Sequence, residues 1–234
     1  MLGWIRGWGR SARACRERFP ALFATDAMDG DLVALDTETT GLDPKRAEIV
    51  AIGAVRIRGN RLLTSQGFSA VVKPTRPIDP ASIRIHQIRP VDVQRGGLDV
   101  ATAIERLVAF IGPRPLIGYY LEFDVAVIDR TMRELAGGAG IRLPNERIEV
   151  SALYYDTVLR KRQSLQLYGQ VDLRMETIRR DLSLPAFPQH DATSDAVMAG
   201  LMYLKLRELA EGGDRTPPRP TEKIPLSPRG RGPG

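Results

Sequence analysis

Apolar and polar residues follow a strand-like pattern early in the chain, and that pattern predicts three strands. The apolar run Leu32–Leu35 is typical of a buried strand, and we expect the first strand over Leu32–Asp36. The stretch 48–72, EIVAIGAVRIRGNRLLTSQGFSAVV, predicts two more strands, joined at Gly59 and Asn60 by a tight hairpin turn. Prolines punctuate the next segment, KPTRPIDP at 73–80, which predicts a loop.

Helical spacing of apolar residues dominates the rest of the chain. Apolar residues recur at intervals of three and four over Ala101–Ile111, and the proline-rich GPRP ends that helix. The short strand LIGYY at 116–120 precedes a helix through EFDVAVIDRTMREL. Further helices are expected around 151–162, around 172–182 and from about Ala192 to Leu209. Meandering strands followed by alternating helices and strands predict an α/β fold with a mixed central β-sheet flanked by helices.

Length and charge divide the chain into one domain and two basic ends. The 234 residues are 43% hydrophobic and 26% charged, which suits a single globular domain. The net charge of +6 lies at the ends: residues 1–24 hold five arginines against one glutamate, and residues 212–234 hold five basic residues against two acids. We expect a basic N-terminal segment at 1–24 with a short amphipathic helix, a domain at 25–211, and a disordered tail at 212–234.

The basic ends leave two interpretations open. They can attract nucleic acid by long-range electrostatics, or they can be ordinary solvated tails. The single cysteine, Cys15, excludes an internal disulfide and suits a reducing compartment, so we expect a cytoplasmic protein. No apolar stretch approaches the roughly 20 residues needed to span a bilayer, and the arginine-rich start is not a convincing signal peptide.

Two acids at the end of the first predicted strand need an explanation. Asp36 and Glu38 are two residues apart, so their side chains point to the same face of a strand. Like charges repel, and each carboxylate resists desolvation. A fold gains no stability from this arrangement alone, so the pair predicts a site for a positive species.

Three further residues are candidate companions of this pair. Asp124 lies early in its predicted helix, where a solvated acid complementing the helix dipole is the ordinary alternative. Asp195 lies among small and apolar residues, which indicate a closely packed helix. His190 precedes that helix, where an exposed loop histidine is the alternative, and Asp191 is a candidate N-cap. Four acids and one histidine form the inventory of a two-metal hydrolytic site for Mg²⁺ or Mn²⁺.

Three motifs in this order resemble the DEDDh family of 3′–5′ exonucleases, the DnaQ-like superfamily of the epsilon proofreading subunit of bacterial DNA polymerase III. LDTETTGLDP resembles the first motif, LIGYYLEFD the second, and HDATSDA the third with its His-x₄-Asp spacing. The resemblance covers about Asp31–Leu209. It implies an RNase H-like fold and hydrolysis of nucleic acid from the 3′ end, which releases nucleoside 5′-monophosphates.

The resemblance also implies a role for each matched residue. Asp36 would bridge two divalent ions, Glu38 and Asp195 would complete the site of the nucleophile-side ion, and Asp124 would hold the other. His190 would be the general base, which suits its ordinary pKa near neutrality. Substrate contacts are expected from Thr37, Thr39, Leu42, His86 and Phe123.

The chain departs from the family pattern in two places. Many members carry His-Asn in the second motif, where this chain has Tyr119 and Tyr120. His86 lies in a segment resembling the family's VHGIT, but Gln87 replaces the glycine and Ala81 stands where an acid is common. A substrate contact and an exposed histidine therefore both stay open for His86.

Alternative functions and partners also stay open. An RNA-directed relative, of the oligoribonuclease or ribonuclease T type, would share the same five residues. A non-catalytic nucleic-acid-binding subunit of a polymerase is a third reading, disfavoured because every ligand is present. Single-stranded DNA is the expected substrate, and a DNA polymerase or another replication or repair protein is a possible partner. RQSLQLYG at 162–169 loosely resembles a sliding-clamp-binding peptide, but its helical spacing favours an ordinary helix.

Overall fold

The fold is described from a computed structural model of the chain. The described residues are 13–24, 30–137, 141–164, 170–187 and 190–211. The tail expected at 212–234, the first 12 residues of the basic N-terminal segment and residues 165–169 of the clamp-like peptide lie outside them.

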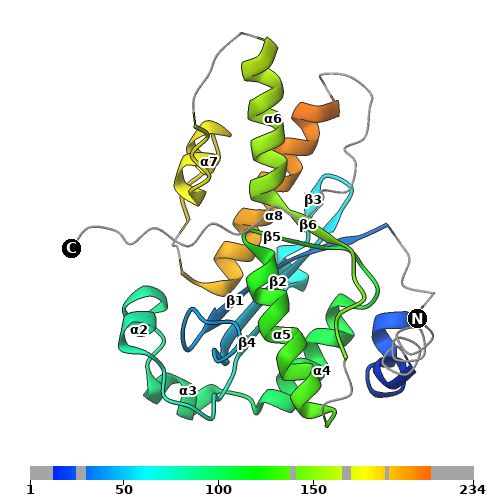
Figure 1. The fold of residues 1–234 in the computed structure, drawn as a ribbon, viewed down its shortest axis with the longest axis vertical. Helices are drawn as coiled ribbons and strands as arrows, with labels where there is room; N and C mark the ends of the chain where they lie inside the picture. The colour runs from blue at the N-terminus through cyan, green and yellow to red at the C-terminus, as the bar shows by residue number, and fades with distance from the viewer. Residues whose placement is uncertain (1–12, 25–29, 138–140, 165–169, 188–189, 212–234) are drawn as a thin grey trace, which may run out of the picture.

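A mixed sheet forms the centre of the fold (Figure 1). Its strands are β1 (Leu32–Thr39), β2 (Ile49–Arg58), β3 (Arg61–Leu62), β4 (Phe68–Val71), β5 (Leu116–Gly118) and β6 (Arg147–Glu149). The order is β3-β2-β1-β5-β6, and β4 also pairs with β2. β2 runs antiparallel to β1, whereas β5 runs parallel to β1 and β6 parallel to β5. The α/β prediction with a mixed sheet is confirmed, and the carboxyl ends of β1, β5 and β6 share one edge.

Helices cover both faces of this sheet. They are α2 (Pro80–His86), α3 (Pro90–Gly96), α4 (Val100–Ile111), α5 (Leu121–Leu135), α6 (Val150–Ser164), α7 (Met175–Asp181) and α8 (Ala192–Glu211), with 3-10 turns η1 (Pro20–Phe23) and η3 (Thr64–Gln66). Alternate residues of β1 divide the core. Val33 and Leu35 join the cluster under α4 and α5, and Ala34 joins the one under α6, α7 and α8. Asp36 has the parity of Ala34 and therefore points toward α8.

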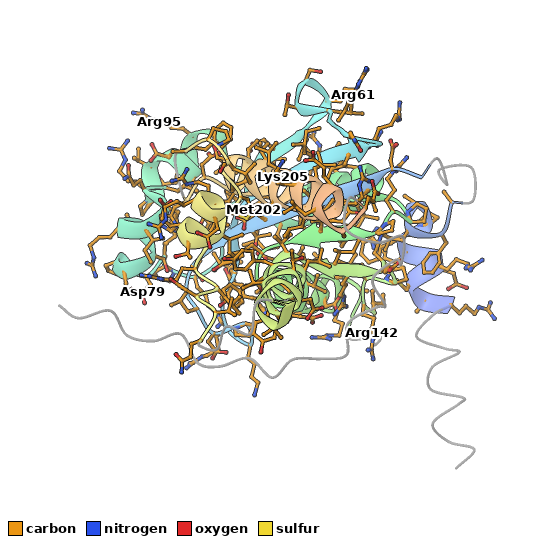
Figure 2. The ribbon with its side chains drawn as sticks, turned by 90° about the horizontal axis from the view of Figure 1, so that it is seen from above. Arg61, Asp79, Arg95, Arg142, Met202 and Lys205 are labelled. Carbon is orange, nitrogen blue, oxygen red and sulfur yellow. The ribbon has the colours of Figure 1, made fainter. Side chains whose placement is uncertain are left out.

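The two ends of the molecule differ in what they carry (Figure 2). Asp79, which caps α2, and Arg95 of α3 lie at one end, and Arg142 lies away from them, on the side of the N-terminal segment. The first end is also that of the β1 carboxyl terminus, because the Asp79 N–H donates to the Thr40 carbonyl at 3.0 Å. Within the described ranges, no helix is long and apolar enough to cross a membrane.

The N-terminal segment contributes to the core on the side of Arg142. Residues 13–18 of this segment form a helix. Cys15, Phe19 and Leu22 are buried, and the Cys15 thiol donates to the Arg142 carbonyl at 3.5 Å. These contacts join the described part of the basic segment to the rest of the fold.

The hairpin prediction is confirmed at its turn and wrong in its second strand. Arg58 pairs with Arg61 across Gly59 and Asn60. The second strand is split, however, into β3 and β4, with η3 between them. The polar run Thr64–Gln66 forms that 3-10 turn, and the chain then pairs again with β2.

Three short elements were not predicted. α2 and α3 begin at Pro80 and Pro90, because proline suits the first turn of a helix as well as a loop. In α2 the Asp79 carboxylate also accepts from the Ala81 N–H at 2.8 Å. β6 has only three residues, too few for a visible alternation.

Gly53 of β2 allows α8 to lie directly on the sheet beside the first acid. Gly53 pairs with Asp36 across the β1–β2 ladder. A Cβ at Gly53 would collide with the backbone carbonyl of Ala192, the first residue of α8. The missing side chain therefore brings the start of α8, which carries Asp195, against β1.

We expect Gly53→Ala to lower the free energy of unfolding by about 1–3 kcal/mol, because helix backbone cannot yield as a flexible side chain can. The measurement is urea-induced unfolding. Gly96→Ala is the matched control, since no atom lies within 4 Å of its added Cβ, and it should change stability by about 0.5 kcal/mol or less. Equal stability of the two variants would contradict the packing of α8 on Gly53.

Candidate metal-binding and active site

Four acids converge at the edge of the sheet where the parallel strands end. Asp36 and Glu38 belong to the last half of β1. Asp124 lies in the first turn of α5, which follows β5, and Asp195 lies in the first turn of α8. Ligand sites in α/β sheets commonly form beyond the carboxyl ends of strands. The structure thus brings together the four acids that the motifs predicted.

Asp36 is the electrostatic centre of the group. Burial raises the pKa of Asp36 well above its ordinary value, and the charges of Asp124, Asp195 and Glu38 raise that pKa further. Among the described residues, no ion pair joins Asp36, Asp124 or Asp195 to a lysine or arginine. Asp36, Asp124 and Asp195 therefore lack an ion pair with a lysine or arginine among the described residues, and negative charges collect around Asp36.

Asp124 is held by the strand rather than by its own helix. Its Oδ1 accepts from the Thr37 backbone N–H at 3.0 Å and from the Thr37 hydroxyl at 2.5 Å. Asp124 is 4% exposed, so the alternative of a solvated first-turn acid is wrong. Burial raises the pKa of Asp124 to about 7, although the Thr37 hydrogen bonds act in the opposite direction.

The third motif forms a compact group with Glu38. Ligand atoms of Glu38, His190 and Asp195 all lie within 4.8 Å of one another. Glu38 and Asp195 are buried, whereas His190 is exposed, as its ordinary alternative predicted. The His190 backbone N–H donates to Asp195 Oδ2 at 2.9 Å, and His190 has a left-handed φ of 63°. Asp195 thus holds the backbone of His190 beside Glu38.

The next acid in the third motif has a different role. Asp191 accepts from the Ser194 N–H at 2.8 Å and so caps α8, as predicted. Its charge nevertheless raises the pKa of Asp195, after burial, which is the larger cause. The His190 N–H bond lowers that pKa in part.

The donor set fits divalent ions of the Mg²⁺ class. Carboxylate oxygens are the ligands that hard cations prefer, and an imidazole is tolerated by Mn²⁺. Burial is the largest cause of the raised pKa values of Asp36, Asp124 and Asp195, and negative neighbours add to it, so the described residues do not fully compensate these charges. A bound cation would supply that compensation.

The predicted substrate contacts differ in accessibility. Leu42 is 56% exposed, and Phe123 is partly buried against the core. Thr37 and Thr39 are buried, and the Thr39 hydroxyl donates to the Gly41 carbonyl at 2.7 Å. A substrate contact by any of these residues stays a prediction.

His86 is 6% exposed, so the alternative of an exposed histidine is wrong. Its Nδ1 accepts from the Ile88 N–H at 3.0 Å, and its Nε2 has no hydrogen-bond partner among the described residues. Burial lowers the pKa of His86, and the nearby charge of His190 lowers it further. His86 therefore lies near His190, and its contact with substrate stays a prediction.

The two tyrosines of the second motif make contacts of their own. The Tyr119 hydroxyl donates to the Leu173 carbonyl at 2.8 Å and so ties β5 to the segment before α7. The rings of Tyr119 and Tyr120 meet edge to face, with centroids 4.6 Å apart. Tyr120 adopts a left-handed φ of 56°, a conformation that asparagine tolerates better than tyrosine. With these two tyrosines in place of His-Asn, Asp124 keeps its hydrogen bonds to Thr37.

Sequence reasoning missed one acid at this edge, Glu149. It ends β6 and accepts hydrogen bonds from the starts of two helices. An acid directly after a predicted strand would have been the signal, but the strand itself was too short to detect.

Comparison with known proteins agrees with this geometry. A model of the exonuclease family RNase_T matches residues 33–203, which include all five clustered residues. The chain belongs to the RNase_T exonuclease family. This finding confirms the DnaQ-like resemblance drawn from the three motifs.

Relatives and a solved structure extend the comparison. A DNA polymerase III epsilon-like protein of Rhodobacter capsulatus is 32% identical over 178 residues, 74% of this chain and 23% of that protein. A PolC-type DNA polymerase III of Thermotoga maritima is 24% identical over 77% of this chain and 12% of its own length. The chain therefore spans less than a quarter of either relative. Exonuclease I of E. coli with a dT13 oligonucleotide gives a TM-score of 0.62 at 17% identity over 78% of this chain and 42% of that one, which confirms the RNase H-like fold.

We expect the metal-free protein to lose stability as pH rises from about 4 to about 7. The pKa of Asp124 is raised from 3.8 to about 7, so in this window the folded state keeps a proton that the unfolded chain has released. The stabilisation is complete below pH 4 and is lost above pH 7, with a magnitude on the order of 2–4 kcal/mol. Urea unfolding in EDTA at several pH values measures it.

Asp124→Asn is the control for this pH dependence, because asparagine keeps an acceptor for Thr37 but does not titrate. Its stability should vary less between pH 4 and 7 than that of the parent. Parallel pH profiles for parent and variant would contradict the raised pKa of Asp124.

Proposed function

We propose that this chain is a metal-dependent 3′–5′ exonuclease that hydrolyses phosphodiester bonds at nucleic-acid 3′ ends and releases nucleoside 5′-monophosphates. The observation that carries the proposal is the convergence of Asp36, Glu38, Asp124, His190 and Asp195 at one sheet edge. Membership of an exonuclease family makes phosphodiester hydrolysis the corresponding chemistry. A non-catalytic subunit would have no need to hold four carboxylates together against the repulsion between their charges.

Two divalent ions, Mg²⁺ or Mn²⁺, are the proposed cofactors. Asp36 would contribute to both sites, Glu38 and Asp195 to one, and Asp124 to the other. The ions would stabilise charge on the attacking and leaving oxygens of an in-line displacement. The protein orients the ligands in advance, since Thr37 fixes one oxygen of Asp124 and the His190 N–H fixes one oxygen of Asp195.

His190 is proposed as the general base. Its exposed ring lies beside Glu38 and Asp195, where an attacking water can reach a ring nitrogen. That nitrogen would accept the proton of the water as the water oxygen approaches phosphorus. The hydrogen bond from the His190 backbone to Asp195 keeps the histidine next to the acids while its ring stays free to carry the proton away.

Single-stranded DNA is the proposed substrate. Exonuclease I, a structural neighbour, has been solved with a dT13 oligonucleotide, which supports this choice over RNA. Exposed Leu42 would contact the terminal base, because an apolar side chain can stack against any base. The epsilon-like and PolC-type relatives support a DNA polymerase as partner and a cytoplasmic location, both as parts of this proposal.

The test offers one sequence as 3′-labelled linear DNA, 5′-labelled linear DNA, closed single-stranded circle and RNA, with Mn²⁺ or EDTA. We expect immediate release of the 3′ label as a nucleoside 5′-monophosphate, a descending ladder from the 5′-labelled strand, and no reaction in EDTA. The circle should stay intact. Cleavage of the circle would identify an endonuclease and contradict the proposal, and faster digestion of RNA would favour the exoribonuclease alternative.

Two variants of the third motif control this assay. Asp195→Asn keeps an acceptor for the His190 N–H but removes a ligand charge, so activity should fall by at least about 100-fold. Asp191→Asn keeps the cap on α8 and should retain activity within about threefold. Equal losses of activity in the two variants would show that the total negative charge of this segment supports the reaction, and not a metal ligand at Asp195.

A further inference from the structure

The residue at the N-cap position of α5, the helix that carries Asp124, makes no capping hydrogen bond with its side chain. This residue is Tyr120, whose φ of 56° is left-handed. The first N–H groups of a helix have no partner inside the helix, and a cap side chain usually accepts from them. At the start of α5 that acceptor must come from elsewhere in the chain.

Glu149 supplies it from the end of β6. Its Oε1 accepts from the Tyr120 N–H at 3.0 Å, and its Oε2 accepts from the Leu121 N–H at 2.8 Å. The same Oε1 accepts from the N–H and the hydroxyl of Ser151, in the first turn of α6, at 3.0 and 2.7 Å. The carboxylate of Glu149 thus caps the N-termini of two helices, α5 and α6, with four hydrogen bonds.

The position of Asp124 depends on this capping of α5 by Glu149. Asp124 lies one turn after Leu121, so the start of α5 fixes where its Cα lies. Thr37 of β1 fixes where its carboxylate points. Glu149 and Gly118 pair across β6 and β5, which places the acceptor beside the turn that leads into α5.

We propose that Glu149 is a positioning residue for the metal ligand Asp124, and that it sets the affinity of the site for a divalent cation. This inference rests on the proposed function, since it requires Asp124 to bind an ion. Replacing a residue that orients a metal ligand without binding the metal itself typically weakens metal affinity by about 10–100-fold. Glu149 has this relation to Asp124 through the backbone of α5.

The four hydrogen-bond donors that face Glu149, which are three backbone N–H groups and the Ser151 hydroxyl, require a carboxylate at position 149. All four groups donate, and only an ionised carboxylate offers acceptors on both oxygens. In Glu149→Gln one amide NH₂ must face an N–H or hydroxyl donor, which leaves at least one donor without a partner. Glu149→Asp keeps both acceptors but is shorter by one methylene, so it can satisfy one helix start better than two.

The experiment titrates Mn²⁺ into the full chain by calorimetry, without nucleic acid, for the parent and three variants. Glu149→Gln should bind Mn²⁺ at least about tenfold more weakly than the parent, and Glu149→Asp should lie between them. Ser151→Ala is the matched control, because it removes a donor to the same carboxylate on the α6 side only. Its Mn²⁺ affinity should stay within about twofold of the parent.

Thermal unfolding in EDTA separates positioning from simple support of the fold. Parent-like Mn²⁺ affinity in Glu149→Gln, with a lowered unfolding midpoint, would overturn the proposal. If Glu149→Gln does not fold, Glu149→Asp with parent affinity would overturn it equally. Parent binding of Mn²⁺ with no exonuclease activity would contradict the proposed function alone, whereas absence of Mn²⁺ binding by the parent would overturn both.

Discussion

Repulsion among carboxylates at the carboxyl edge of the sheet is the constraint around which this molecule is arranged. Asp36, Glu38, Asp124 and Asp195 come from three elements and share a small, largely buried space. Without a cation, burial and like charges raise the pKa of several of them. The surrounding contacts therefore have to hold the acids in place against the repulsion between their negative charges.

Backbone and hydroxyl donors do most of this holding. Thr37 donates twice to Asp124, and the His190 N–H donates to Asp195. Gly53 leaves room for the start of α8 beside Asp36, so Asp195 can approach Asp36. Each contact ties an acid of the cluster to a different element, which makes the geometry of the site a property of the whole sheet edge.

The proposed ligands could be recognised from the sequence because their signal is local. Asp36 and Glu38 follow an apolar strand, and a five-residue spacing joins His190 to Asp195. What could not be predicted is how the ligands are supported, because that depends on distant pairing. Glu149 caps a helix that begins 28 residues earlier, and only the parallel pairing of β5 and β6 brings the two together.

The other differences between the predicted and the observed structure also have physical causes. Pro80 begins a helix at the end of the segment expected to be a loop, and Pro90 begins another helix that was not predicted, because proline suits both loops and helix starts. The strand after Gly59 and Asn60 is split by a polar 3-10 turn that strand periodicity does not reveal. The exposed interpretation of His86 was wrong because a lone histidine carries no signal of its burial.

Proton release on metal binding tests most directly whether these carboxylates are assembled for divalent cations. Mn²⁺ is titrated into the protein at pH 6.5 in two buffers of different ionisation enthalpy, and the difference in heat gives the protons released. Because the pKa of Asp124 lies at about 7 without metal, the structure predicts release of about one proton or more per protein. Saturable binding without proton release, or no binding at all, would contradict a site built from buried acids awaiting a cation.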